Sequence, residues 1–172
     1  MTEPTAELVT SSHRHGGHVG HVGRQVLSFT LENETYAVDI LRVQEIRGFS
    51  PVTHMPDAPP HLLGVLNLRG SIVPIMDMRR RIGIAPIDPS PLTVIIVLSM
   101  ESARGRREFG LVVDGVSDVV DLAPEDLKDA PDRNEEQGEQ LISAIATVGE
   151  RMILVLDVDR MLAGDDEQLA AA

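Results

Sequence analysis

Residues Gly64–Met78 have the sequence GVLNLRGSIVPIMDM, and the rest of the chain is organised around them. Two apolar runs flank Gly70 and Ser71, a pair that can adopt the positive φ angles of a tight hairpin turn, so we expect two antiparallel strands. Because side chains alternate along a strand, Asn67 and Arg69 would share the face opposite the leucines. This polar face is either an ordinary solvated surface or part of a functional site.

Composition narrows the class of protein. The chain has 172 residues with 42% hydrophobic content, which suffices for one sizeable core or two small ones. A net charge of −12 and the scarcity of aromatic residues argue against nucleic acid and anionic membranes as partners. The absence of cysteine excludes disulfides and thiolate metal sites. Because the sequence shows neither a membrane-spanning run nor a signal peptide, we expect a cytoplasmic globular protein.

The first 24 residues differ in composition from the rest of the chain. They contain Thr, Ser, Gly and His without a hydrophobic period, so we expect a disordered tail at 1–24. Clustered histidines can bind a transition metal, but neither carboxylates nor helical spacing accompany them, and a flexible linker is the simpler interpretation. These histidines are His13, His15, His18 and His21.

The remaining chain alternates between short apolar runs and breaks rich in Pro and Gly. We expect a basic loop at 102–108, a helix from Pro124, and a last helix that Asp157 caps and Gly164 ends, with a frayed end at 163–172. The residues at 61–64 could form one helical turn. Strands are predicted at 27–31, 36–40, 43–47, both arms of the 64–78 hairpin, 92–100, 109–113, 116–122, 141–148 and 152–156.

Two internal similarities indicate a duplication. The segment 36–46 aligns without gaps on 109–119, and 72–80 aligns on 152–160, where each copy is a strand that ends in an aspartate before a short helix. Chance similarity among common β-strand residues is the alternative. Five short strands in each half would leave exposed edges unless the half closes, so we predict two packed five-stranded barrels, at about 25–88 and 89–162.

Motifs for catalysis are missing from the sequence. It contains no glycine-rich phosphate loop, no nucleophile elbow and no helical histidine pair, so we expect neither enzymatic activity nor a cofactor. The acidic segment 114–139 matches no calcium loop, and a solvated face explains it better than a cation site. Strand-end aspartates are expected to cap turns, and these are Asp39, Asp77, Asp114 and Asp157.

Three ordered motifs carry a family resemblance over about 25–162. They are YAVDILRVQEIRG at 36–48, NLRGSIVPI at 67–75 and VVDGVSDV at 112–119. Together they resemble the CheW-like domain, which occurs in chemotaxis coupling proteins, in the regulatory domain of the kinase CheA and in the adaptor CheV. The resemblance implies an all-β fold with short helices, built from two packed five-stranded Src-homology-3-like barrels. It also implies a cytoplasmic scaffold that couples chemoreceptors to the histidine kinase CheA at membrane-associated arrays.

The resemblance also implies roles for particular residues. Glu45 and Arg69 match a family pair that is important for structure and signalling. Val43 falls into both predicted contact sets, so the division between partners stays open. The kinase-binding positions are Leu27, Ile40, Val43 and Ile46. The receptor-binding groove comprises Val43, Gly64, Val94, Val116 and Val119.

Two other functions stay open at this point. The same domain would serve an adaptor of a non-flagellar array, such as a twitching-motility system. A metal-responsive binding protein that uses the histidine-rich tail is the more remote alternative.

Overall fold

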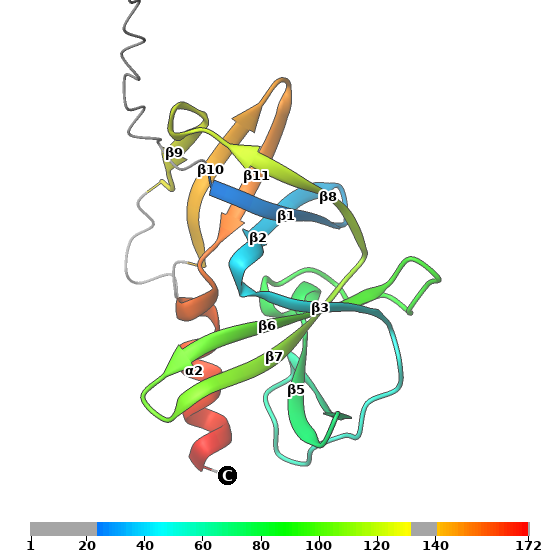
Figure 1. Ribbon diagram of the computed structural model, residues 1–172. Helices are drawn as coiled ribbons and strands as arrows, with labels where there is room; N and C mark the ends of the chain where they lie inside the picture. The colour runs from blue at the N-terminus through cyan, green and yellow to red at the C-terminus, as the bar shows by residue number, and fades with distance from the viewer. Residues whose placement is uncertain (1–23, 132–140, 172) are drawn as a thin grey trace, which may run out of the picture.

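A computed structural model describes residues 24–131 and 141–171, which form two packed β-sheets and a few short helices (Figure 1). The all-β class with short helices is therefore confirmed. Sheet A has the strand order β8-β1-β2-β11-β10-β9, and sheet B has the order β3-β6-β7-β5-β4. Sheet A comprises β1 (Arg24–Leu31), β2 (Glu34–Asp39), β8 (Gly115–Leu122), β9 (Leu127–Asp129), β10 (Ile142–Val148) and β11 (Arg151–Leu156). Sheet B comprises β3 (Val43–Gly48), β4 (Leu62–Leu68), β5 (Ser71–Asp77), β6 (Val94–Ser102) and β7 (Gly105–Val113).

Four helical segments connect or follow these strands. The 3₁₀ turn η1 (Ile40–Arg42) leads from β2 to β3, and α1 (Met78–Arg81) follows β5. The 3₁₀ turn η2 (Pro124–Asp126) precedes β9, and α2 (Val158–Ala171) follows β11. In Figure 1 the red helix α2 descends from β11 and passes behind the β6–β7 hairpin. The helix thus carries the chain from sheet A to sheet B.

The hairpin predicted at 64–78 is confirmed as β4 and β5, but its turn lies one residue earlier than expected. Arg69 and Gly70 adopt positive φ angles of 53° and 87°, whereas Ser71 already pairs with Leu68 as the first residue of β5. The Asn67 side chain accepts a hydrogen bond from the Gly70 amide at 2.9 Å. This bond compensates for the cost of a positive φ at Arg69.

The position of β6 between two apolar clusters explains why its sequence is apolar almost without a break. Ile96 and Leu98 pack in the core between the two sheets, whereas Ile95 and Val97 belong to a separate cluster inside sheet B. Since consecutive side chains point to opposite faces, a strand covered on both sides is apolar at every position. Sheet A has its own inner cluster, which includes Val26. Within the described residues, one apolar cluster therefore combines residues of both sheets, and each sheet also forms a smaller cluster from its own residues.

Strands from the two predicted halves, divided at about residue 88, are interleaved between the two sheets. Strands β1 and β2 lie in sheet A with β8 to β11, and β6 and β7 lie in sheet B with β3 to β5. Parallel pairs join the distant segments: β2 pairs with β11, and β5 pairs with β7. Hairpin patterns report only local antiparallel pairing, so the sequence could not show which hairpins share a sheet. Neither ladder closes between its first and last strands within the described residues, so these are open sheets rather than closed barrels.

The internal similarities fall on equivalent parts of the structure. In one pair of copies, β2 leads through η1 into β3, and β7 leads through Asp114 into β8, so each copy crosses from one sheet to the other. In the other pair, β5 leads into α1 and β11 leads into α2. The repeats therefore mark the two sheet crossings and the two strand-to-helix corners.

Several local expectations are corrected. The supposed basic loop at 102–108 is part of the β6–β7 hairpin, in which Glu101 pairs with Arg106 across the strands. Opposite charges at such positions stabilise a ladder. Only the 3₁₀ turn η2 follows Ala123, and the residues at 61–64 enter β4 instead of a helical turn.

The C-terminal helix extends beyond its predicted end. The Asp157 carboxylate accepts a hydrogen bond from the Arg160 amide at 3.0 Å, as expected of a cap. The helix nevertheless continues through Gly164 to Ala171, so the predicted frayed end is not observed there. Met161 and Leu162 are buried in the core between the sheets, and this packing outweighs the helix-breaking tendency of one glycine. The predicted tail at 1–24, with its four histidines, lies almost wholly outside the described residues.

Candidate partner-binding surface

Strand β3 ends the strand order of sheet B and presents apolar side chains toward sheet A. Val43 pairs with Leu98, and Ile46 pairs with Ile96, and both partners are buried in the core between the sheets. Cross-strand partners point to the same face of a sheet, so Val43 and Ile46 face the space between the sheets as well. Val43 is partly buried, whereas Ile46 is 44% exposed. Val94, at the start of β6, packs against the same core.

Strand β8 has the corresponding position at the edge of sheet A. Val116 pairs with Phe29, and Val119 pairs with Leu27, and both partners are again buried in the core between the sheets. Val116 is partly buried, and Val119 is 51% exposed. The two edge strands thus expose apolar groups that lie on the intersheet side.

Each of these edge strands follows one of the two sheet crossings. The crossing through η1 precedes β3, and the crossing at Asp114 precedes β8. Gly48, at the end of β3, pairs with Val94, which in turn pairs with Val113 next to the Asp114 crossing. The edge strands therefore border one region, which we name the intersheet rim. It comprises Val43, Ile46, Val94, Val116 and Val119.

Three predicted contact residues do not belong to the rim. Leu27 is buried in the core beside its cross-strand partner Val119, so its side chain offers no direct contact surface. Ile40 is partly buried against the same core, but it lies in η1 and therefore outside the edge strands β3 and β8. Gly64 lies on β4 at the opposite edge of sheet B, and a Cβ at this position would stand 2.1 Å from the Thr53 carbonyl oxygen. The Gly64 backbone is thus covered by the loop before β4.

The predicted pair of Glu45 and Arg69 is in contact. Arg69 Nη2 donates to Glu45 Oε2 at 2.6 Å, and Arg47 Nη1 lies 3.9 Å from the other carboxylate oxygen. Strands β3 and β4 are opposite edges of sheet B and form no ladder with each other, so the ion pair bridges the open side of the sheet. The Arg69 side chain is 77% exposed, which makes the pair a surface salt bridge.

A second arginine pair was not foreseen from the sequence. Arg79 of α1 donates to both carboxylate oxygens of Asp114, from Nε at 2.8 Å and from Nη2 at 2.7 Å. The side chains are only 10% and 20% exposed. The hydrogen bond from Arg79 holds the pKa of Asp114 below its usual value, against the opposing effect of burial, and a bond from the Glu32 amide lowers this pKa further.

Helix α2 is attached to sheet B by charged groups. Asp165 lies 2.6 Å from His61 Nε2, and Asp166 lies 3.3 Å from Arg107 Nε. Both carboxylates are largely buried. The helix thereby connects the end of β11 in sheet A to β7 and to the residue before β4.

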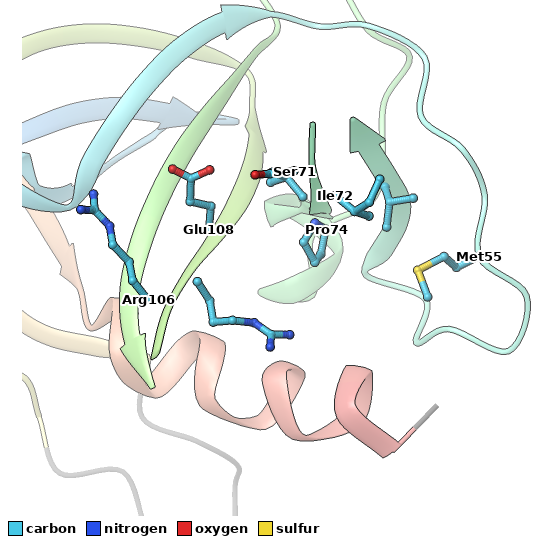
Figure 2. Close-up of a pocket in the computed structure, with 9 residues that line it drawn as sticks. Met55, Ser71, Ile72, Pro74, Arg106 and Glu108 are labelled. Atoms are coloured by element: carbon cyan, nitrogen blue, oxygen red, sulfur yellow. The ribbon is translucent and has the colours of Figure 1, made fainter. Parts of the chain in front are cut away.

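A separate open pocket of about 540 Å³ lies between β5, β7 and the loop that contains Met55 (Figure 2). Ile72 and Pro74 form an apolar side, and Arg106 and Glu108 project from β7. None of the residues that line it was predicted as a contact. The pocket is thus distinct from the intersheet rim.

Residues 24–131 and 141–171 contain neither a candidate metal site nor a candidate membrane-spanning helix. Within these ranges no group of three or more His, Asp or Glu side chains is arranged to hold a metal ion. In the same part of the chain no helix has both the length and the apolar character that a membrane crossing requires.

Comparison with known proteins identifies the family. The family model described as the CheW-like domain matches residues 25–166. The chemotaxis protein CheW of Klebsiella aerogenes is 40% identical over 148 residues, which cover 86% of this chain and 87% of that protein. The chemotaxis protein CheW of Rhizobium meliloti is 33% identical, with 89% of this chain and 96% of that protein covered.

A solved structure shows the same fold. The crystal structure of the scaffolding protein TtCheW from Thermoanaerobacter tengcongensis matches with a TM-score of 0.72 and 26% identity, over 81% of this chain and 92% of that one. This protein belongs to the CheW-like domain family. It is a coupling adaptor of the chemotaxis type.

Proposed function

We propose that this adaptor joins the histidine kinase CheA to the cytoplasmic tips of chemoreceptors in membrane-associated arrays, and that it does so without catalysis of its own. The observation that carries the proposal is the intersheet rim, where two edge strands leave apolar side chains partly exposed. Partner surfaces concentrate their binding free energy in such apolar anchors. An adaptor needs exposed anchors of this kind on a rigid scaffold.

The two sides of the rim are proposed to bind different partners. Val116 and Val119 on β8, with Val94, form the proposed receptor side, and Ile46 on β3 forms the proposed kinase side. Val43 lies where the predicted contact sets overlap. The exposed Glu45–Arg69 pair borders β3 and is proposed to keep the kinase side in place. Leu27 and Gly64 have no part in this proposal as contact residues.

The names of the relatives favour chemotaxis over the alternatives. The similar proteins from Klebsiella and Rhizobium are both named chemotaxis proteins, which does not favour a twitching-motility array. The metal-responsive alternative depends on His13, His15, His18 and His21, all of which lie outside the described residues.

Co-sedimentation tests the bridging role. Membranes that contain chemoreceptors would be mixed with purified CheA and this protein, pelleted, and assayed for bound kinase and for autophosphorylation. The proposal predicts that kinase enters the pellet, and becomes more active, only when this protein is present. Equal sedimentation and equal activity without the protein would contradict it.

Three single substitutions locate the surface. Val119→Asp and Ile46→Asp place a charge on the two sides of the rim, where partner binding would desolvate it. Met152→Asp is the matched control, because Met152 is a similarly exposed apolar residue (57%) on the inner strand β11. We expect Val119→Asp to reduce receptor binding and Ile46→Asp to reduce kinase binding, each about tenfold or more, with Met152→Asp unchanged. If all three variants bind alike, the rim is not the partner-binding surface.

A further inference from the structure

The unforeseen pair of Arg79 and Asp114 lies at one of the two places where the strands cross between the sheets. Asp114 is the single residue between β7 of sheet B and β8 of sheet A. Its amide donates to the Thr30 carbonyl oxygen at 3.1 Å, and its Oδ2 accepts from the Glu32 amide at 2.7 Å. The crossing residue is thereby bound to β1 and to the turn that follows it.

Arg79 connects the same residue to sheet B. Besides its two bonds to Asp114, Arg79 Nη1 donates to the Ala85 carbonyl oxygen at 2.9 Å. The guanidinium belongs to α1, directly after β5. Planar bidentate pairs restrict orientation as well as distance, and burial protects them from screening by salt. We name the bidentate pair of Arg79 and Asp114 the clasp. The clasp therefore holds the Asp114 crossing in one geometry.

The other crossing has weaker attachments. At η1, the Asp39 carboxylate accepts from the Leu41 amide at 2.9 Å, and Arg42 donates to Asp159 at 2.7 Å. The Arg42 and Asp159 side chains are 31% and 55% exposed. Arg24 Nε also lies 3.6 Å from Asp39, and these two side chains are 36% and 29% exposed, again more than Arg79 and Asp114. Exposed pairs contribute little and are screened by salt. Of the two crossings, the one that leads into β8 is thus the more rigidly held.

We infer that Arg79 and Asp114 are positioning residues, which set the spacing between the edge strands β3 and β8 and thereby the shape of the intersheet rim. Neither side chain belongs to the rim itself. Asp114 immediately precedes β8, so a rotation of the crossing would carry Val116 and Val119 with it. The inference rests on the proposed function only for its consequence, which is that partner binding depends on this spacing.

Loss of the clasp is expected to loosen the sheets without separating them. Val158, Met161 and Leu162 of α2 pack in the core between the sheets, and Asp165 attaches the helix to His61. These contacts do not involve the clasp. A clasp variant can therefore stay folded while the spacing of the edge strands changes.

The test combines a distance measurement with a variant that removes both charges. Arg79→Met with Asp114→Asn replaces the pair by neutral groups of similar shape, which avoids a stranded buried charge. The chain has no cysteine, so Gln44→Cys and Ser117→Cys introduce two unique spin-label sites on exposed residues of β3 and β8. Arg80→Met is the matched control, because Arg80 lies on the same helix but is exposed.

We expect the label distance to be narrowly distributed in the parent and in Arg80→Met, and to shift or broaden in the double-neutral variant. Binding to receptor-containing membranes should weaken about tenfold in that variant, which is an ordinary size for coupling between separate sites. A destabilised control, Val155→Ala inside sheet A, should lower the melting temperature without moving the label distance.

An unchanged distance distribution in the double-neutral variant would overturn the inference, and so would a changed distribution with unaltered binding. Failure of the proposed function gives a different result. In that case Val119→Asp binds membranes as well as Met152→Asp does, whatever the label distance shows.

Discussion

Arg69 and Arg79 both belong to the hairpin and helix around which the fold is built, yet they hold their carboxylate partners in opposite surroundings. Arg69 reaches Glu45 through one hydrogen bond and is mostly exposed. Arg79 donates two hydrogen bonds to Asp114, and its side chain is buried. The first pair bridges two edges of sheet B, whereas the second fixes a crossing between the sheets.

A recognisable motif pair is therefore not necessarily the ion pair that stabilises the fold. An exposed ion pair contributes about 0 to 1 kcal/mol, because water and salt screen it. Removal of one partner from a buried pair costs about 3 to 5 kcal/mol, because the other charge stays desolvated. The Glu45–Arg69 pair is therefore suited to a partner surface, and the Arg79–Asp114 pair to the architecture.

The largest expected effect follows from Arg79→Ala. This substitution leaves the Asp114 carboxylate without its guanidinium, so we expect a loss of about 3 kcal/mol in the free energy of unfolding, measured in urea. Arg80→Ala on the same helix should change it by less than about 0.5 kcal/mol. A loss below 1 kcal/mol for Arg79→Ala would mean that the clasp is no stronger than the surface pair.

The second largest effect is expected in acid, where the pH dependence of stability should distinguish the Arg79–Asp114 pair from the Glu45–Arg69 pair. Because the folded protein holds the pKa of Asp114 below its ordinary value of 3.8, ionised Asp114 adds stability at higher pH. This contribution is lost as the pH falls through the lowered pKa. The stability difference between the parent and Asp114→Asn should therefore be full near neutral pH and shrink below about pH 4. A difference that stays constant down to the lowest pH would contradict the lowered pKa.

The smallest expected effect concerns Glu45 and Arg69. A double-mutant cycle with Glu45→Ala, Arg69→Ala and the double variant should give a coupling free energy of about 0 to 1 kcal/mol, reduced by added salt. A coupling near 3 kcal/mol would show that the pair is effectively buried. In the charge-swapped Glu45→Arg, Arg69→Glu protein, recovered stability without recovered kinase activation would indicate that Arg69 contacts a partner directly.

Local patterns in the sequence were enough to predict the hairpins. Alternation at 27–31 and 36–40 gave β1 and β2, and the apolar run at 92–100 gave β6. The turn at Arg69 was misplaced because an arginine with positive φ is uncommon, and here Asn67 supplies the compensating hydrogen bond.

Long-range pairing was beyond what the sequence could show. The repeated segments 36–46 and 109–119 indicated a duplication, but not that each copy crosses between sheets. Nothing in their local patterns connects Arg79, which falls in the short helix expected after the strand at 72–77, with Asp114, which was expected to cap a turn. The family resemblance implied a contact role for Leu27, whereas the structure places this side chain in the core beside Val119.

We propose that partners cover the intersheet rim, and protection of an introduced thiol from alkylation is a direct test. Since the chain has no cysteine, Val119→Cys and Met152→Cys each provide one exposed thiol, on the rim and on β11. Alkylation rates would be measured with and without receptor-containing membranes and CheA. We expect the complete mixture to slow alkylation of Val119→Cys about tenfold or more and to leave Met152→Cys unchanged, because a covered anchor is excluded from solvent. Equal rates for Val119→Cys in both conditions, or protection of Met152→Cys alone, would contradict it.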